Sequence, residues 1–337
     1  MTKIKVGING MGRIGRTLVR EITRRTNLNL EIVAVNNPGP AESYRHLLKY
    51  DSIHGTFDKE VELVGDKLIV GGHSIKFFSE FDPAEIDWSS HEVDIVLDAT
   101  GRFNTKADLG KHLGGSVKKV IMCAPGKDLD GTFVVGINHQ TYNPDEHHII
   151  SNASCTTNCL APLAKVLNDT WGIQNGFMTT IHSYTSDQLL LDGSHSDFRR
   201  ARSAAMSMVP TTTGAAKAVG LVIPELKGKL DGYAVRVPTP NVSLVDLTVN
   251  LKASVTKKDV NNAMKAASEG SLKGILHYEV NPLVSIDFTG SPFSSIFDSA
   301  LTNIIEGNVV KVVSWYDNEA GFSNRVIDLA ALVGQKL

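Results

Sequence analysis

The densest group of reactive side chains in this sequence lies between Ser151 and Cys159, which reads SNASCTTNC. The apolar run 160–167 that follows predicts a helix, so we expect Cys155 at or just before a helix N-terminus. At such a position the helix dipole lowers the pKa of a thiol, and the backbone N–H groups can hold an oxyanion. The pattern therefore predicts that Cys155 is a nucleophile.

The other two cysteines are interpreted differently. Cys159 lies one helical turn after Cys155 and heads an apolar run, so we expect it in the core, and Cys123 is also interpreted as structural. A metal site is not predicted, because the spacing is not C-x-x-C and no second cysteine pair exists. Three cysteines without an export signal favour reduced thiols in the cytoplasm.

His182 is the candidate partner for the Cys155 thiolate. It ends a predicted strand over 178–182 and opens the polar loop 183–188. Catalytic groups often lie in loops that follow strands, and histidine exchanges protons near neutral pH. A structural histidine fits the pattern equally well, and only a contact with Cys155 distinguishes the two interpretations.

Several segments combine positive charge with hydroxyl groups. They are the arginine run 199–202, Arg236, the threonine run 211–214 and the stretch 154–156. Guanidinium groups and hydroxyls suit phosphate recognition. For two of the three arginines in the run, a solvated or interface position fits as well.

A glycine motif near the start of the chain predicts a dinucleotide site. Residues 10–15, GMGRIG, match G-x-G-x-x-G, follow a predicted strand over 4–8 and precede a predicted helix over 16–26. In this context the first glycine permits a tight turn, the second admits the pyrophosphate, and the third lets the helix pack on the strand. A simple strand–turn–helix corner is the alternative.

The end of the second predicted strand, 31–35, bears on the choice of dinucleotide. An acidic residue is expected about 20 positions after the last glycine in an NAD site. Here Asn37 stands 22 positions beyond Gly15. A neutral amide can bind a ribose hydroxyl but does not repel a 2′-phosphate. The sequence therefore predicts that both NAD and NADP can be used.

The elements around these residues fall into two patterns. Short β-branched runs, including 94–97 and 119–122, alternate with helices in the first third and predict a parallel, doubly wound α/β sheet, a Rossmann dinucleotide-binding domain. Longer strands follow over 177–181, 234–237, 243–251 and 309–315, with one helix over 255–269 capped by Thr256. They predict an α+β catalytic domain with a mostly antiparallel sheet. The expected divisions are 1–154, 155–317, and a C-terminal helix in 318–337 that returns to the first domain.

The composition is that of an ordinary globular chain of 337 residues, with 42% hydrophobic and 21% charged residues and a net charge of −2. This balance does not indicate nucleic acid as a main partner. No apolar segment approaches the length that spans a bilayer, and the stretch 1–8 lacks the apolar core of a signal peptide. We expect a cytoplasmic protein with a small-molecule substrate.

Eight stretches in fixed order give the whole chain a close resemblance to phosphorylating glyceraldehyde-3-phosphate dehydrogenases. The most specific is ASCTTN within SNASCTTNCLAPLAKVL at 151–167. The others are INGMGRIGR at 8–16, LLKYDSIHG at 47–55, TTIHSYTSDQ at 179–188, RRAR at 199–202, PTTTGAAKAV at 210–219, RVPTPNVSLVDL at 236–247 and WYDNEAGFSNR at 315–325. The resemblance implies a homotetramer that oxidises its aldehyde through a cysteine thioester, with NAD or NADP as cofactor and inorganic phosphate as co-substrate.

The resemblance also implies roles for single residues. Cys155 and His182 would be catalytic. The substrate's phosphate would lie on Thr185, Asp187 and Arg236, and inorganic phosphate on Ser154, Thr156, Arg200, Thr213 and Gly214. The dinucleotide would contact Gly10, Gly12, Arg13, Ile14, Gly15, Asn37, Thr100 and, at the nicotinamide amide, Asn318.

Some positions depart from the family pattern. Asn37 replaces the usual acid, and Gly193-Ser194 resembles NADP-using members, whereas Phe81 stands where an arginine would favour NADP alone. Ala320 and Phe322 replace bulkier or hydroxylated residues near the nicotinamide. Three alternatives to the main reading are erythrose-4-phosphate dehydrogenase, a non-phosphorylating aldehyde dehydrogenase, and a binding protein that holds nucleic acid in its cofactor groove.

Overall fold

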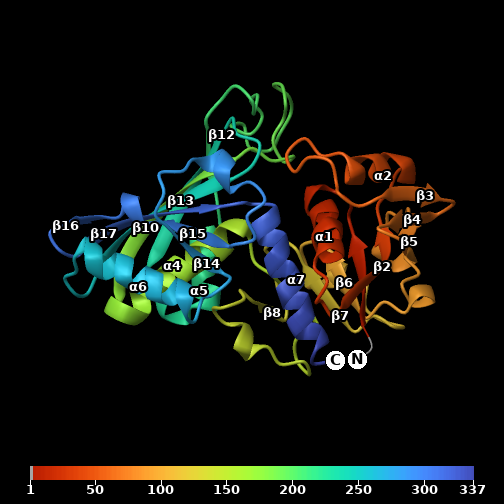
Figure 1. Cartoon of the computed structure of the whole chain (residues 1–337), viewed down its shortest axis with the longest axis horizontal. Coiled ribbons are helices and arrows are strands. Elements are labelled where there is room, and N and C mark those ends of the chain that lie inside the picture. Colours follow the sequence, from red (N-terminus) through yellow and green to blue (C-terminus); the bar gives the residue numbers. More distant parts are fainter. Residues whose placement is uncertain (1–2) are drawn as a thin grey trace. The chain divides into compact units, whose positions relative to one another are not determined.

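The computed structural model describes residues 3–337, so Met1 and Thr2, which open the predicted first domain, lie outside it. The chain forms two compact units (Figure 1). The first unit comprises Met1–Val135, His139–Ala153 and Ser323–Leu337, and the second comprises Gly136–Asn138 and Ser154–Phe322. Within residues 3–337, no helix has both the length and the apolar character needed to cross a bilayer.

The first unit is built on a nine-stranded sheet in the order β3-β4-β5-β2-β1-β6-β7-β9-β8. The central strand β1 (Ile4–Asn9) pairs in parallel with β2 (Leu30–Asn36) on one side and β6 (Ile95–Asp98) on the other. The direction of winding thus reverses between β1 and β6, where doubly wound sheets bind ligands. The predicted Rossmann architecture is confirmed. Beyond β6 the sheet continues in parallel with β7 (Lys119–Met122), β9 (Ile149–Ser151) and β8 (Gly131–Thr132), and on the other side β5 (His73–Phe78) pairs in parallel with β2.

Three strands at one edge of this sheet were not predicted. They are β3 (Val61–Val64), β4 (Lys67–Val70) and β5 (His73–Phe78), joined as two antiparallel hairpins. Each is short, and the turns between them contain glycines with positive φ, at Gly65 and at Gly71-Gly72. The Gly-Asp and Gly-Gly pairs in VELVGDKLIVGGHSIKF were the signal that could have revealed them.

Helix α1 (Arg13–Arg24) begins three residues earlier than predicted, so half of the glycine motif lies inside it. The reason is the close packing of Gly15. A Cβ at this position would lie 1.8 Å from the carbonyl oxygen of Gly10, so only glycine lets the first turn of α1 approach the strand–turn corner. Gly12 is the N-cap residue, and a Cβ there would meet nothing within 4 Å.

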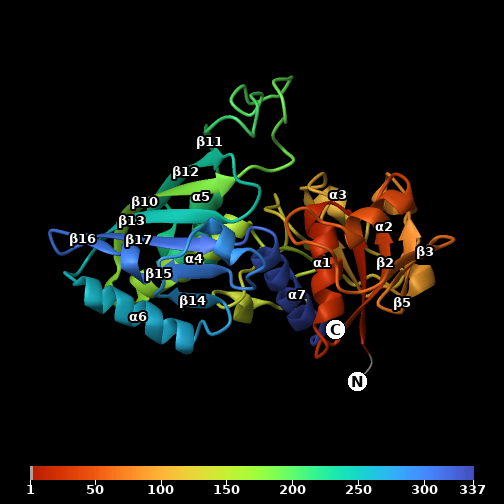
Figure 2. The same ribbon diagram turned by 45° about the horizontal axis from the view of Figure 1, so that its top comes forward.

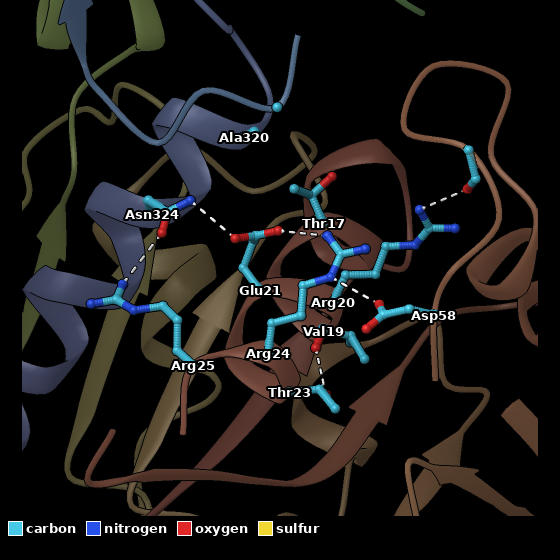
Figure 3. A network of polar contacts seen from close by, with 12 residues as sticks. Thr17, Val19, Arg20, Glu21, Thr23, Arg24, Arg25, Asp58, Ala320 and Asn324 are labelled. Atoms are coloured by element: carbon cyan, nitrogen blue, oxygen red, sulfur yellow. Dashed lines mark hydrogen bonds and ion pairs between the residues drawn. The ribbon is translucent and has the colours of Figure 1, made fainter. Parts of the chain in front are cut away.

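Helix α7 (Ala320–Gly334) ends the chain, and from Ser323 onward it belongs to the first unit. Figure 3 shows the Asn324 side chain of α7 between Glu21 of α1 and Arg25, the residue after α1. Asn324 donates to Glu21 at 3.3 Å, and Arg25 binds Asp328 at 2.7 Å. These contacts, together with buried Val326, Ile327 and Leu329, fasten the end of the chain to the dinucleotide-binding unit. The other helices of the first unit are α2 (Ala41–Lys49) and α3 (Lys106–Gly110).

The second unit contains a sheet in the order β11-β12-β10-β13-β17-β15-β14, with β16 against β17. Its long strand β10 (Ile173–Ser183) runs parallel to β12 and antiparallel to β13. Only one other pair, β14 with β15, is parallel, so the predicted mostly antiparallel sheet is confirmed. The other strands are β11 (Val209–Thr212), β12 (Leu230–Val237), β13 (Ser243–Leu251), β14 (Leu276–Glu279), β15 (Ser295–Asp298), β16 (Asn303–Ile305) and β17 (Val309–Tyr316).

Three helices of the second unit pack on one face of this sheet (Figure 2). The central one, α4 (Cys155–Trp171), contacts β10, β13, β15 and β17, and it is flanked by α5 (Ala215–Val222) and α6 (Lys257–Glu269). The predicted cap of α6 is confirmed, because Thr256 and Asp259 form a capping box. Cys155 is the first residue of α4, as the sequence predicted.

The two glycines of the α1 corner give a matched test of this packing. We expect Gly15→Ala to lower the free energy of unfolding by about 3 kcal/mol, because the new methyl group meets backbone that cannot move aside. Gly12→Ala should cost under about 1 kcal/mol, the loss of a glycine N-cap. Urea denaturation of both variants checks this, and equal losses would contradict the packing described for Gly15.

Candidate active site

The second unit brings Cys155 and His182 together. Cys155 opens α4, whose N-cap Ser154 accepts a hydrogen bond from the Thr157 N–H at 3.0 Å. His182 lies at the end of β10, and its Nε2 is 3.6 Å from the Cys155 Sγ. This is the contact that distinguishes a reactive pair from a structural histidine. The two side chains are close enough to exchange a proton after a small adjustment.

The other side of the His182 ring is held by two groups. Its Nδ1 lies 2.7 Å from the carbonyl oxygen of Ser183 and 2.8 Å from Nη1 of Arg236, which also donates to that carbonyl at 3.1 Å. If Nδ1 carries the proton, it donates to Ser183 and leaves Nε2 able to accept a proton from Cys155. If Nδ1 accepts from Arg236, Nε2 carries the proton and can donate toward sulfur.

Tyr316 packs beside Cys155 and His182, and it was not identified from the sequence as a residue of this site. Its hydroxyl lies 2.9 Å from Thr156 Oγ1 on α4 and 2.9 Å from Thr180 Oγ1 on β10. Its ring meets that of His182 edge-on at 5.9 Å. The hydroxyl of Thr156, one of the residues expected at inorganic phosphate, is thus turned into the core. The signal available was the tyrosine in WYDNEAGFSNR.

Asn318 is fixed by two serines that sequence reasoning did not single out. The hydroxyls of Ser183 and Ser243 each donate to its Oδ1 at 2.9 Å. All three residues are buried. Because Oδ1 is anchored in this way, the orientation of the amide is set and its Nδ2 remains as the donor end.

The residues predicted to bind phosphate include two arginines, Arg200 and Arg236, that lie in different surroundings. Arg200 forms an ion pair with Asp187 and donates to Thr211 Oγ1 at 2.9 Å, which joins the loop after β10 to β11. Arg236 lies beside His182 instead. Of the other candidates, the Thr185 N–H donates to Gln188, Thr213 accepts from the Ala215 N–H, and Gly214 is the N-cap residue of α5.

The three arginines of the run 199–202 differ in their exposure to solvent. This agrees with the alternative interpretation, in which two of them are solvated. Arg202 pairs with Asp192 at 2.9 Å, and both side chains are more than half exposed. Arg199 is exposed as well, so of the three arginines only Arg200 is partly buried. One member of the run therefore faces the interior contacts and two face solvent.

The first unit carries the features of a dinucleotide site. Gly10 has φ +96°, and a Cβ there would lie 2.8 Å from the Thr100 N–H, so the glycine turn packs directly on the turn after β6. No side chain caps the first turn of α1, and space is open at Gly12. Backbone N–H groups at such a helix start suit a pyrophosphate, so the residues present fit a dinucleotide.

A buried polar network, not predicted from the sequence, joins the strand ends below that turn. Asp98 accepts from Asn9 Nδ2 at 2.8 Å and from Thr100 Oγ1 at 2.6 Å. Asn36 donates to Asn9 Oδ1 at 2.8 Å. The carboxyl ends of β1, β2 and β6 are therefore tied together at the point where the sheet's winding reverses.

Two predicted cofactor residues are also held within the chain. Arg13 binds both carboxylate oxygens of Asp51, at 2.6 and 3.1 Å. Burial acts to raise the pKa of Asp51, but Arg13 and the N–H groups of Ile53 and His54 together lower it well below its usual range. Asn37 accepts from the Met11 N–H at 2.8 Å, which places it against the glycine turn.

Comparison with known proteins assigns both parts of the chain to one family. Residues 154–318 match the glyceraldehyde 3-phosphate dehydrogenase C-terminal domain, and residues 4–106 match the NAD-binding domain of the same family. The chain belongs to the glyceraldehyde-3-phosphate dehydrogenase family. It is therefore an oxidoreductase with an NAD-binding domain, and none of these matches favours an erythrose-4-phosphate dehydrogenase.

Relatives align over almost their whole length. Glyceraldehyde-3-phosphate dehydrogenase 1 of Bacillus cereus is 58% identical over 332 residues, 98% of this chain and 99% of the relative. Glyceraldehyde-3-phosphate dehydrogenase of Geobacillus stearothermophilus is 57% identical over 333 residues, 99% of each chain. Glyceraldehyde-3-phosphate dehydrogenase 2 of Trichormus variabilis is 55% identical over 335 residues, again 99% of each.

The environment of this dehydrogenase's histidine keeps the ring uncharged. Burial lowers the pKa of His182 to about 3, and the nearby charge of Arg236 acts in the same direction. The backbone carbonyl of Ser183 opposes the shift but does not cancel it. At neutral pH the imidazole is therefore neutral and able to accept a proton.

The pKa of the Cys155 thiol is raised, whereas its position at a helix start predicted a lowered pKa. Burial raises the pKa of Cys155, while Arg236 and the hydroxyl and N–H of Thr156 act to lower it. The predicted lowering is wrong in sum, because the loss of hydration exceeds the stabilisation from the helix start. A neutral thiol beside a neutral imidazole is thus favoured over the ion pair.

The shift at His182 predicts how acid affects stability. Its pKa is about 3 in the folded chain and about 6.5 when unfolded, so the unfolded chain binds an extra proton as pH falls below 6.5. The stability that the neutral ring contributes is present above pH 6.5 and is progressively lost toward pH 3.

We therefore expect His182→Gln to be less acid-sensitive than the parent. Between pH 7 and 5 the parent should lose about 2 kcal/mol more free energy of unfolding than the variant. Urea denaturation at both pH values measures this, and His91→Gln serves as a control at a less buried ring. Parallel losses in parent and His182→Gln would refute the described environment.

Proposed function

We propose that this chain oxidises glyceraldehyde 3-phosphate to 1,3-bisphosphoglycerate, with NAD or NADP as cofactor and inorganic phosphate as co-substrate. The observation that carries the proposal is the Cys155–His182 contact of 3.6 Å at the start of α4, with Arg236 beside it. A nucleophile, a base and a positive charge lie together where an aldehyde with an anionic group can be held.

The chain's own residues account for the steps as follows. The Cys155 sulfur attacks the aldehyde carbon, and its proton passes to Nε2 of His182, in the form whose Nδ1–H donates to Ser183. The N–H groups at the start of α4 and the protonated imidazole hold the resulting oxyanion. The bound dinucleotide supplies the acceptor for the hydride that leaves this carbon. Phosphate then attacks the thioester, the Cys155 thiolate departs with the electrons of the broken C–S bond, and the proton held on Nε2 of His182 returns to it.

The anion-binding residues take up the phosphates in this proposal. Thr185, Asp187 and Arg236 serve the substrate's phosphate, and the Asp187–Arg200 ion pair joins this group to the residues for inorganic phosphate. Inorganic phosphate lies on Arg200, with Ser154, Thr156, Thr213 and Gly214. Since the Thr156 hydroxyl is bound to Tyr316, its contribution would come from the backbone. Asn318 Nδ2 would donate to the nicotinamide amide.

The dinucleotide is assigned to residues 1–154 and the returning segment 318–337, and catalysis to residues 155–317. Gly10, Gly12, Arg13, Ile14 and Gly15 would bind the pyrophosphate and Asn37 the adenosine ribose, with Thr100 at the adjoining turn. Supporting this, the glycine corner is open at Gly12 and the start of α1 is uncapped. Use of both dinucleotides fits the absence of a carboxylate at position 37.

We further propose that the enzyme is a cytoplasmic homotetramer. Helices cover one face of the second unit's sheet, and on strands of this unit Phe177 is 74% and Tyr233 is 52% exposed. The loop before β11 adds exposed Leu190, Leu191, Phe198, Met206 and Met208. Apolar groups gathered in this way are typical of protein–protein interfaces.

The catalytic proposal is tested by following nicotinamide absorbance with glyceraldehyde 3-phosphate and each cofactor, with and without inorganic phosphate. We expect phosphate-dependent reduction by the parent. Cys155→Ser should lose at least about 10³-fold in turnover, since the nucleophile is lost, yet still bind cofactor. Cys159→Ser is the matched control. Retained turnover in Cys155→Ser would exclude the thioester.

The assembly is tested by light scattering after size exclusion. A mass four times the chain's 36.4 kDa is expected for the parent. Phe198→Glu combined with Leu191→Glu should give smaller species, because charges replace apolar groups that are exposed in the single chain. A monomeric parent would rule out the tetramer.

A further inference from the structure

The corner that follows β2 contains a hydrogen-bond arrangement not required by the glycine motif. Asn37 uses its Oδ1 to accept from the Met11 N–H at 2.8 Å. Its Nδ2 donates to the carbonyl oxygen of Pro38 at 2.8 Å and also contacts the hydroxyl of Tyr44. Both amide hydrogens of Asn37 are therefore engaged within the chain.

Tyr44 closes this arrangement from α2. Its hydroxyl donates to the Pro38 carbonyl at 3.2 Å while it receives the Asn37 amide. Its ring stacks on Phe77 with centroids 5.8 Å apart, which fixes where the hydroxyl lies. Asn37, Pro38 and Tyr44 thus form a closed triad in which every side-chain hydrogen has an acceptor.

The neighbouring donors are used as well. The Asn37 N–H donates to the Phe78 carbonyl at 3.1 Å, and Pro38 has no N–H. The Gly39 N–H donates to Ser79 Oγ at 3.2 Å, and that hydroxyl returns a hydrogen bond to Gly39 at 3.3 Å. The donors of the segment 37–39 are therefore satisfied within the chain. Asn37 Oδ1 receives one hydrogen bond, from Met11, so its second lone pair can accept from a ligand.

We propose that Tyr44 is a specificity-determining residue, which holds the Asn37 amide as an acceptor and so favours a ribose 2′-hydroxyl over a 2′-phosphate. The inference rests on the proposed function, in which the adenosine ribose binds at Asn37. A hydroxyl can donate to Asn37 Oδ1, whereas a phosphate brings only acceptors and negative charge. NADP is still admitted, because no carboxylate repels it, but it gains no hydrogen bond here.

The charge nearby does not reverse this preference. Arg45, the residue after Tyr44, is paired through its guanidinium with Glu42 on the same helix. A 2′-phosphate would have to compete with that carboxylate for the arginine. The preference for NAD therefore comes from hydrogen-bond polarity rather than from a repelling acid.

The test is calorimetric titration of the full-length protein with NAD and with NADP, in the parent and in Tyr44→Phe. The substitution keeps the ring on Phe77 and releases one Asn37 hydrogen for a 2′-phosphate. We expect the ratio of the NADP to the NAD dissociation constant to fall at least threefold. Tyr50→Phe, which removes an exposed phenol hydroxyl at the end of α2, should leave the ratio unchanged.

Repeating the Tyr44→Phe substitution in an Asn37→Asp protein shows whether its effect depends on the Asn37 amide. In Asn37→Asp, which has no amide hydrogen to release, the ratio should favour NAD more strongly, and adding Tyr44→Phe should not improve NADP binding. An unchanged ratio in Tyr44→Phe, or an equal loss of both affinities, would overturn the proposal for Tyr44. If the parent binds neither dinucleotide, the proposed function fails instead, which is a different result.

Discussion

The arrangement of the catalytic unit depends on one partly buried positive charge beside a thiol and an imidazole. Arg236 acts on both groups, but in opposite chemical senses: it favours the thiolate of Cys155 and disfavours the imidazolium of His182. Burial disfavours both charged forms. Both groups are therefore favoured in their neutral forms. An anionic substrate that draws on Arg236 would alter this balance directly.

Hydrogen bonds elsewhere in the second unit fix the positions of the side chains around Cys155 and His182. Tyr316 links the first turn of α4 to β10 through two hydroxyls, and Asn318 is anchored by Ser183 and Ser243. These contacts are buried, where a lost hydrogen bond is costly, so they hold the side chains in place. These surrounding positions thus determine the geometry of Cys155, His182 and Asn318.

In the first unit, backbone N–H groups at the start of α1 are open to a ligand, whereas the donors after β2 are hydrogen-bonded within the chain. Gly10 and Gly15 bring strand, turn and helix so close together that the start of α1 is exposed at Gly12. Around the end of β2 the donors are instead consumed internally, by Tyr44, Pro38 and Ser79. Donors at one end of the site and acceptors at the other match a pyrophosphate and a ribose hydroxyl.

Much of this could be predicted from the sequence because it is local. Runs of apolar and β-branched residues predicted the bounds of β13 and β7 to the residue, and Thr256 was predicted as the cap of α6. The glycine motif indicated the strand, turn and helix around it. The hairpin strands β3 to β5 were missed because they mix polar with apolar residues and are only partly buried, whereas β7 is buried at every position. The start of α1 was placed late, because the motif was interpreted as a turn and the packing of Gly15 on Gly10 involves residues apart in the chain.

The sequence by itself determined the fold class and singled out Cys155 as the candidate nucleophile, since both follow from residue types and their spacing. Only the tertiary structure decided which histidine meets Cys155, that Tyr316 and two serines support the site, and that the Cys155 pKa is raised rather than lowered. The physical reason is the same in each case. Burial, proximity and hydrogen-bond partners come from segments far apart in the chain, and local patterns do not contain them.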